Sequence, residues 1–142
     1  MERGEAVRAF EQALRRLQEV LREPESSLVR DAAIKRFEFT FELAWKAVQR
    51  ALRKQGILCH SPKGCLSEAF TCGFVRDSPL WIRMIEDRNL TVHTYNERTA
   101  IAIYRNLKEY EPLFEELLQG LGRASESPRP HVPCGMQRRK SF

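Results

Sequence analysis

Apolar residues recur every three or four positions along most of this chain, which is the spacing of one face of an α-helix. The first such stretch covers residues 5–22 and ends before Pro24, whose ring disfavours a helical conformation in the preceding residue. The second covers residues 27–55 and ends at Gly56, a residue type that closes many helices. The pattern therefore predicts two consecutive long helices.

The second helix is apolar on more than one side, so more than one neighbour is expected to cover it. Its continuous stripe consists of Ile34, Phe37, Phe41, Trp45, Val48 and Leu52. Phe39 and Leu43 form an additional strip, which exceeds what one bundle core needs. A strip of this kind left exposed would promote aggregation. We therefore expect a homo-oligomer built from dimers, either a homodimer or a tetramer of dimers.

Three further helices are predicted in the second half of the chain. A loop over residues 56–66 leads into a short helix over 66–72. A helix over 78–95 begins with Ser then Pro, which suit the N-cap and the first turn. The last helix is predicted over 96–118, with Pro112 bending it. The pattern predicts an all-α fold, an antiparallel four-helix up-and-down bundle with an extra short helix.

Composition divides the chain into two parts. Residues 1–120 are predicted to form the helical bundle domain, which Gly120 and Gly122 close. Residues 121–142 form a basic tail rich in Pro, Ser and Arg, which buries too little apolar surface to fold alone and is expected to be flexible. The tail carries part of the net charge of +5, a value that permits contact with nucleic acid without requiring it.

Other features restrict the class of protein. No apolar run approaches the ~20 residues that cross a membrane. The charged N-terminus leads directly into a helix and is no signal peptide, so a cytoplasmic protein is expected. The four cysteines contain no C-x-x-C pair, and free thiols are expected in that compartment. With neither a Gly-rich phosphate loop nor a Gly-Ser nucleotidyltransferase signature, the chain is not expected to transfer nucleotides, and we expect no cofactor and no metal.

One segment, residues 88–95, concentrates the candidate chemistry. Arg88 carries a guanidinium that can hold a phosphate by two parallel hydrogen bonds. His93 carries an imidazole that can move protons near pH 7. On one continuous ideal helix these side chains would diverge by about 140°. To meet at one phosphate they need a helix break, a long side-chain reach, or a second protomer, which a symmetric dimer would supply.

Structural interpretations of the same residues stay open. Arg88 could be a partly buried cation paired with Glu38 or Glu42, which lie one turn apart on the second helix. His93 could be hydrogen-bonded to Asn89 one turn earlier, and that bond would equally orient the imidazole for chemistry. The sequence does not separate these interpretations.

The spacing R-x-x-x-x-H-x-Y, with Asn directly after Arg, resembles the motif of HEPN-type proteins. These are small all-helical proteins, often partners of minimal nucleotidyltransferases. The upstream run over residues 36–46, RFEFTFELAWK, resembles the signature of one branch, the nucleotidyltransferase substrate-binding protein family. The resemblance covers roughly residues 1–120.

The resemblance implies a toxin that acts as a metal-independent endoribonuclease on RNA, with Arg88, Asn89 and His93 as catalytic residues. It also implies that a separate minimal nucleotidyltransferase silences the toxin by placing AMP on Tyr95, which would otherwise be a packed aromatic with a surface hydroxyl. Two alternatives remain. The chain could be a non-catalytic substrate-binding subunit that docks on a nucleotidyltransferase, or a helical oligomerisation module whose motif is vestigial.

Overall fold

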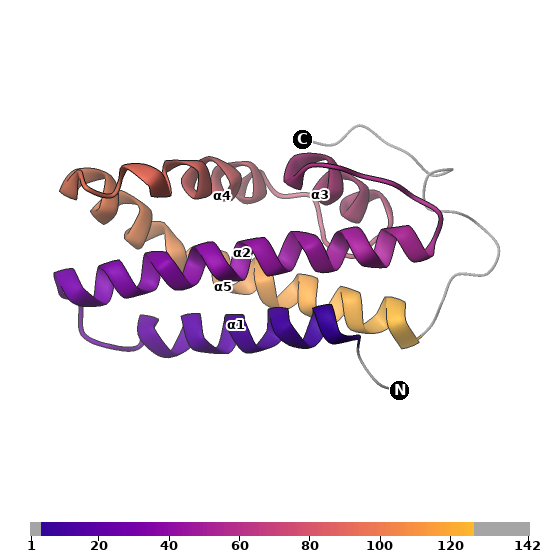
Figure 1. The fold of residues 1–142 in the computed structure, drawn as a ribbon, viewed down its shortest axis with the longest axis horizontal. Coiled ribbons are helices and arrows are strands. Elements are labelled where there is room, and N and C mark those ends of the chain that lie inside the picture. The colour runs from indigo at the N-terminus through magenta and orange to yellow at the C-terminus, as the bar shows by residue number, and fades with distance from the viewer. Residues whose placement is uncertain (1–3, 127–142) are drawn as a thin grey trace.

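A computed structural model describes residues 4–126, which form five α-helices and one 3-10 turn. The elements are α1 (Glu5–Leu21), α2 (Ser27–Lys54), α3 (Pro62–Thr71), α4 (Pro79–Leu90), η1 (Thr91–His93) and α5 (Glu97–Glu126). The chain runs up and down between the two ends of the molecule, and α5 passes behind α2 to lie beside α1 (Figure 1). The predicted all-α bundle is confirmed, with α3 as the extra short helix.

Four aromatic rings join the four long helices at the centre of the core. Phe114 of α5 lies 5.9 Å from Phe10 of α1, 6.5 Å from Phe37 of α2 and 6.3 Å from Trp81 of α4, measured between ring centroids. Each of these side chains is fully buried. Such ring pairs add about 0.5–1.5 kcal/mol each beyond their area burial. The apolar faces of these four helices therefore meet at Phe114.

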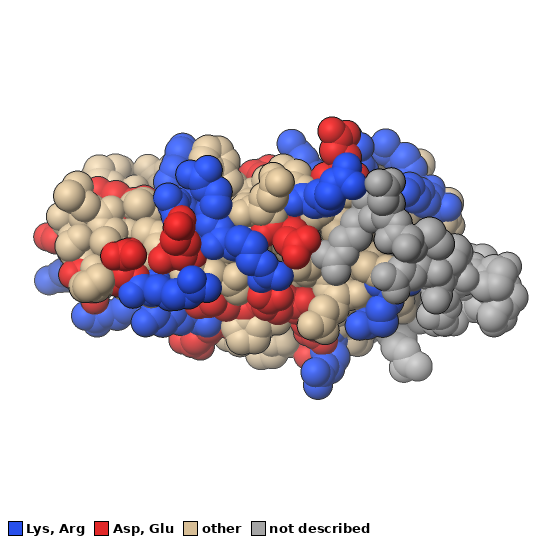
Figure 2. Space-filling view, turned by 90° about the horizontal axis from the view of Figure 1, so that it is seen from below, with Lys and Arg blue, Asp and Glu red and all other residues tan. Residues whose placement is uncertain are grey.

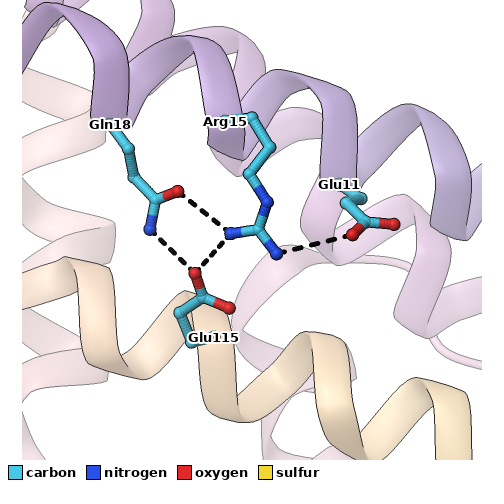
Figure 3. Close-up of polar contacts among 4 residues, drawn as sticks. All are labelled: Glu11, Arg15, Gln18 and Glu115. Atoms are coloured by element: carbon cyan, nitrogen blue, oxygen red, sulfur yellow. Dashed lines mark hydrogen bonds and ion pairs between the residues drawn. The ribbon is translucent and has the colours of Figure 1, made fainter.

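Polar contacts reinforce the packing of α1 against α5. Arg15 pairs with Glu115 and with Glu11, and Gln18 donates a 2.8 Å hydrogen bond to Glu115 (Figure 3). Partial burial pushes the pKa of Glu115 upward, but the hydrogen bonds from Arg15 and Gln18 outweigh burial, so this pKa lies below its usual value. The groups are partly exposed, so we expect a contribution of about 1 kcal/mol or less.

The predicted start of the short helix is wrong. The helix begins at Pro62 because the Ser61 hydroxyl accepts a 3.0 Å hydrogen bond from the Gly64 amide and proline occupies the first turn. The expectation of free thiols is also wrong. Cys59 forms a disulfide with Cys65, whose Cα lies 5.2 Å away, because the turn before α3 folds the chain back on itself.

The predicted end of the last helix is wrong as well. α5 continues to Glu126 rather than stopping near residue 118, and Gly120 and Leu121 are both buried inside it. A Cβ on Gly120 would lie 2.1 Å from the backbone oxygen of Phe74, so this glycine allows the backbone of Phe74 to lie close against α5. The tail predicted over 121–142 thus begins inside α5, and residues 127–142 lie outside the described part of the chain.

Candidate functional site

The helix is interrupted within the motif of residues 88–95. α4 ends at Leu90, a single 3-10 turn covers Thr91–His93, and α5 starts only at Glu97. The prediction of one helix through Tyr95 is therefore wrong. The Thr91 hydroxyl lies 2.7 Å from the Arg88 carbonyl, a side-chain contact that competes with helical hydrogen bonding. Beyond the turn, the Asn96 side chain accepts a hydrogen bond from the Thr99 amide and starts the next helix.

Arg88 is held against α2. Its guanidinium forms an ion pair with Glu42 and lies 5.6 Å from the centroid of the Phe41 ring. A second amino group donates a 3.3 Å hydrogen bond to the Asn89 side-chain oxygen. One third of the Arg88 side chain stays accessible. A guanidinium has five N–H donors, so these contacts leave donors that can face an anion.

Glu38 lies one helical turn before Glu42 and contacts the break itself. Its carboxylate is 2.7 Å from the Thr91 hydroxyl and 3.8 Å from the Lys35 ammonium. The two carboxylates of α2 therefore hold Arg88 and Thr91, which lie on either side of the end of α4. Thr91 was not singled out from the sequence. Its neighbours Val92 and Thr94 are also β-branched or hydroxylated residues, and that cluster was the signal for a break.

His93 and Tyr95 lie on the exposed side of the turn. Tyr95 is 85% exposed, and its hydroxyl is 3.4 Å from Nδ1 of His93. The two rings meet edge to face with centroids 5.9 Å apart. No contact among the described residues joins Arg88 to His93. The hydrogen bond considered between His93 and Asn89 is replaced by the contacts of His93 with Tyr95 and of Asn89 with Arg88.

A groove of about 500 Å³ lies between α1 and α2, and none of its lining residues belongs to the motif. Its lining residues are Ala9, Gln12, Ala13, Arg16, Ala32, Lys35, Arg36, Phe39 and Leu43. Phe39 is 56% exposed there, so the additional apolar strip that the sequence indicates is accessible in the single chain. The strip therefore remains available to another chain.

Two other kinds of feature are absent from residues 4–126. No helix in this range is both long and apolar enough to cross a bilayer. In the same range, no three side chains of His, Cys, Asp or Glu are grouped to hold a metal ion. Figure 2 shows basic and acidic side chains interspersed over the face that it views. Residues 88–95 therefore remain the candidate site of the described chain.

Comparison with known proteins gives a consistent set of similarities. The sequence model of a family described as nucleotidyltransferase substrate binding protein like matches residues 5–123. A curated protein from Haemophilus influenzae named probable ribonuclease HepT is 32% identical over 93 residues, which are 59% of this chain and 64% of that protein. The chain thus spans slightly less than two thirds of that relative's length.

Solved structures share the fold. A protein from Thermus thermophilus has a TM-score of 0.74 and 47% identity, covering 79% of this chain and 98% of that chain. A Haemophilus influenzae structure, described as revealing the fold of a substrate binding domain of a nucleotidyltransferase, has a TM-score of 0.72 and 25% identity. It covers 82% of this chain and 98% of that chain. Both alignments extend over nearly the whole of the known structures.

Proposed function

This chain belongs to the nucleotidyltransferase substrate binding protein family, and from that premise we propose that it is a metal-independent endoribonuclease silenced by a separate nucleotidyltransferase. One observation carries the proposal: an accessible guanidinium and an exposed imidazole flank a helix break that α2 holds in place. The name of the relative, probable ribonuclease HepT, agrees with it. An RNA substrate and such a partner suit a cytoplasmic protein.

In the proposed reaction His93 removes the proton from a ribose 2′-hydroxyl. The 2′-oxygen attacks the adjacent phosphorus, and Arg88 stabilises the negative charge that develops on the phosphorane oxygens. The bond from phosphorus to the 5′-oxygen breaks, and a proton returned by the imidazolium or by water completes the leaving hydroxyl. The products are a 2′,3′-cyclic phosphate and a 5′-hydroxyl. Asn89 would orient Arg88 through its 3.3 Å hydrogen bond.

The proposed site takes its two groups from two protomers. Arg88 contacts α2, whereas His93 contacts Tyr95 on the exposed side of the turn. A two-fold dimer would let Arg88 of one chain serve His93 of the other. The test is incubation of the purified chain with a mixed RNA substrate while metal is chelated, followed by analysis of the 3′ ends. Cyclic phosphate ends are expected.

We expect the protein to be a dimer or a larger homo-oligomer at micromolar concentration, because the Phe39 strip is accessible in the single chain. Light scattering measures this directly. Phe39→Glu is expected to shift the population toward monomer. Leu28→Glu is the matched control, because Leu28 is 80% exposed on the same helix but does not line the groove. A wild-type particle of only 16.6 kDa would contradict the expectation.

Tyr95 is the proposed acceptor of the silencing nucleotide. The side chain is exposed, so its hydroxyl is accessible to a modifying enzyme. The hydroxyl lies 3.4 Å from Nδ1 of His93, so a nucleotide attached there would stand beside the imidazole. Tyr95→Phe is therefore expected to keep cleavage within about threefold of wild type and to abolish labelling by a nucleotidyltransferase with its nucleotide substrate. Mass spectrometry detects the adduct. Tyr104, a buried tyrosine, serves as the control position, and labelling there instead would contradict the assignment.

A second candidate function is supported by the structure described as a substrate binding domain of a nucleotidyltransferase. In that case the bundle docks on a nucleotidyltransferase and presents its substrate without cleaving RNA. The cleavage assay separates the two candidates. A wild-type chain that leaves RNA intact under all the conditions above would favour the binding subunit.

A further inference from the structure

A buried polar cluster joins α4 to α5 immediately beside Arg88. Asp87, on α4, is only 7% exposed and accepts two hydrogen bonds on one carboxylate oxygen. The Tyr110 hydroxyl donates at 2.5 Å and the Asn106 amide at 2.9 Å, both from α5. Arg83 in turn donates to the Tyr110 oxygen at 3.0 Å. Burying a carboxylate costs free energy unless it is hydrogen-bonded in this way. A buried Asp87 is therefore expected to have a structural or functional role.

The cluster lies in the same turn of α4 as Arg88, because Asp87 is its neighbour in the chain. Successive helical residues point about 100° apart, so Asp87 can face α5 while Arg88 faces Glu42 on α2. The end of α4 is thereby fixed from two directions at adjacent residues. The Thr91 contact with Glu38 then fixes the start of the 3-10 turn. Rotation of α4 about its axis would break all three contacts together.

The hydroxyl of Tyr110 remains a donor at neutral pH. Burial raises its pKa, and the hydrogen bond to Asp87 raises it further. The ring also stacks on Phe37 at a centroid distance of 5.8 Å, so it is held independently of the hydroxyl. Removing the hydroxyl alone therefore probes the polar contact while the core packing is kept.

We propose that Asp87, held by Tyr110 and Asn106, is the positioning residue that sets the location of Arg88 and of the turn carrying His93. The proposal rests on the proposed function in one respect, namely that Arg88 acts on the substrate phosphate. Asp87 itself touches no substrate. Asp87 acts by restricting the position of the Arg88 guanidinium. Small displacements of a catalytic group strongly reduce the rate of the catalysed reaction.

Tyr110→Phe is the test variant, because Asp87→Ala would leave a cavity and unpaired donors and could prevent folding. Thr40→Val is the matched control. It also removes one buried hydroxyl, which lies 2.7 Å from the backbone carbonyl oxygen of Arg36 and 3.2 Å from that of Ala13. These residues are far from the Asp87 cluster in the sequence and lie on other helices. Two quantities are measured for both variants: amide hydrogen exchange residue by residue, and kcat and KM for RNA cleavage.

In Tyr110→Phe, exchange at residues 88–93 is expected to speed up about tenfold relative to Thr40→Val, while core amides of α3, which neither hydroxyl contacts, exchange alike in both. The kcat is expected to fall about tenfold with KM nearly unchanged. Equal exchange at residues 88–93 in the two variants would overturn the proposal, as would a kcat loss no larger than that of Thr40→Val. If wild type cleaves no RNA, the proposed function fails, and the exchange comparison alone decides whether Asp87 positions the turn.

Discussion

Gly120→Ala is expected to destabilise the fold by about 3 kcal/mol, at the upper end of the usual cost of overpacking a core. The added Cβ would lie 2.1 Å from the backbone oxygen of Phe74 and 2.8 Å from its carbonyl carbon. Backbone atoms cannot rotate away as a side chain can, and Phe74 and Val75 are themselves buried. Thermal melting followed by circular dichroism should show a fall in Tm of about 10 °C.

Gly4→Ala is the matched control for this experiment. Gly4 has an ordinary φ of −65° and no atom within 4 Å of the position of an added Cβ. It stands at the N-cap of α1, where alanine is a poor residue, so a cost within about 1 kcal/mol is expected. If Gly120→Ala and Gly4→Ala have the same Tm, the close approach of Phe74 to α5 does not exist in solution.

Gly120 also shows why helix ends were harder to predict than helix faces. Periodicity correctly predicted a long amphipathic helix here, because such a face depends only on residues three and four apart. Ile103, Leu107 and Phe114, which follow that spacing, are buried in α5. A glycine near the end of such a pattern indicates a terminator from local propensity. Here its role is set by Phe74, more than forty residues earlier, and no local pattern contains that contact.

The start of α3 illustrates the opposite case, in which the local signal was present. Ser61-Pro62 is the same pair that correctly indicated the start of α4 at Ser78-Pro79. The glycines at positions 56 and 64 favoured a loop instead. The error also hid the disulfide, because the short distance between Cys59 and Cys65 depends on the turn that enters this helix.

At the candidate site, the sequence indicated the residue types but not their arrangement. Arg88 was considered a partly buried cation paired with Glu38 or Glu42, and the structure places it in contact with Glu42. A helix break was one of three routes considered. The Thr91 hydroxyl contacts the Arg88 carbonyl three residues earlier, but its further contact with Glu38 of α2 is a tertiary one that no local pattern contains. The Asp87 cluster was missed because its donors lie about twenty residues away on α5.

His93→Ala is expected to reduce RNA cleavage by ~10²–10⁴, the usual loss when a general acid–base group is removed. The side chain is exposed and its contact is with Tyr95, so the variant is expected to keep the melting temperature of wild type within a few degrees. Arg88→Lys is the companion variant. It keeps the charge but loses the planar fork, so cleavage should fall although an ion pair with Glu42 remains available.

The matched control is His60→Ala, which removes an exposed histidine from the turn before α3, outside the motif. Cleavage of a mixed RNA substrate is followed for all four proteins with metal chelated, and folding is checked by circular dichroism. A contaminating ribonuclease would cleave equally in every preparation, whereas an intrinsic activity depends on the imidazole of residue 93. If His93→Ala cleaves as fast as His60→Ala, the ribonuclease assignment is wrong, and the role of the bundle is then to bind a nucleotidyltransferase.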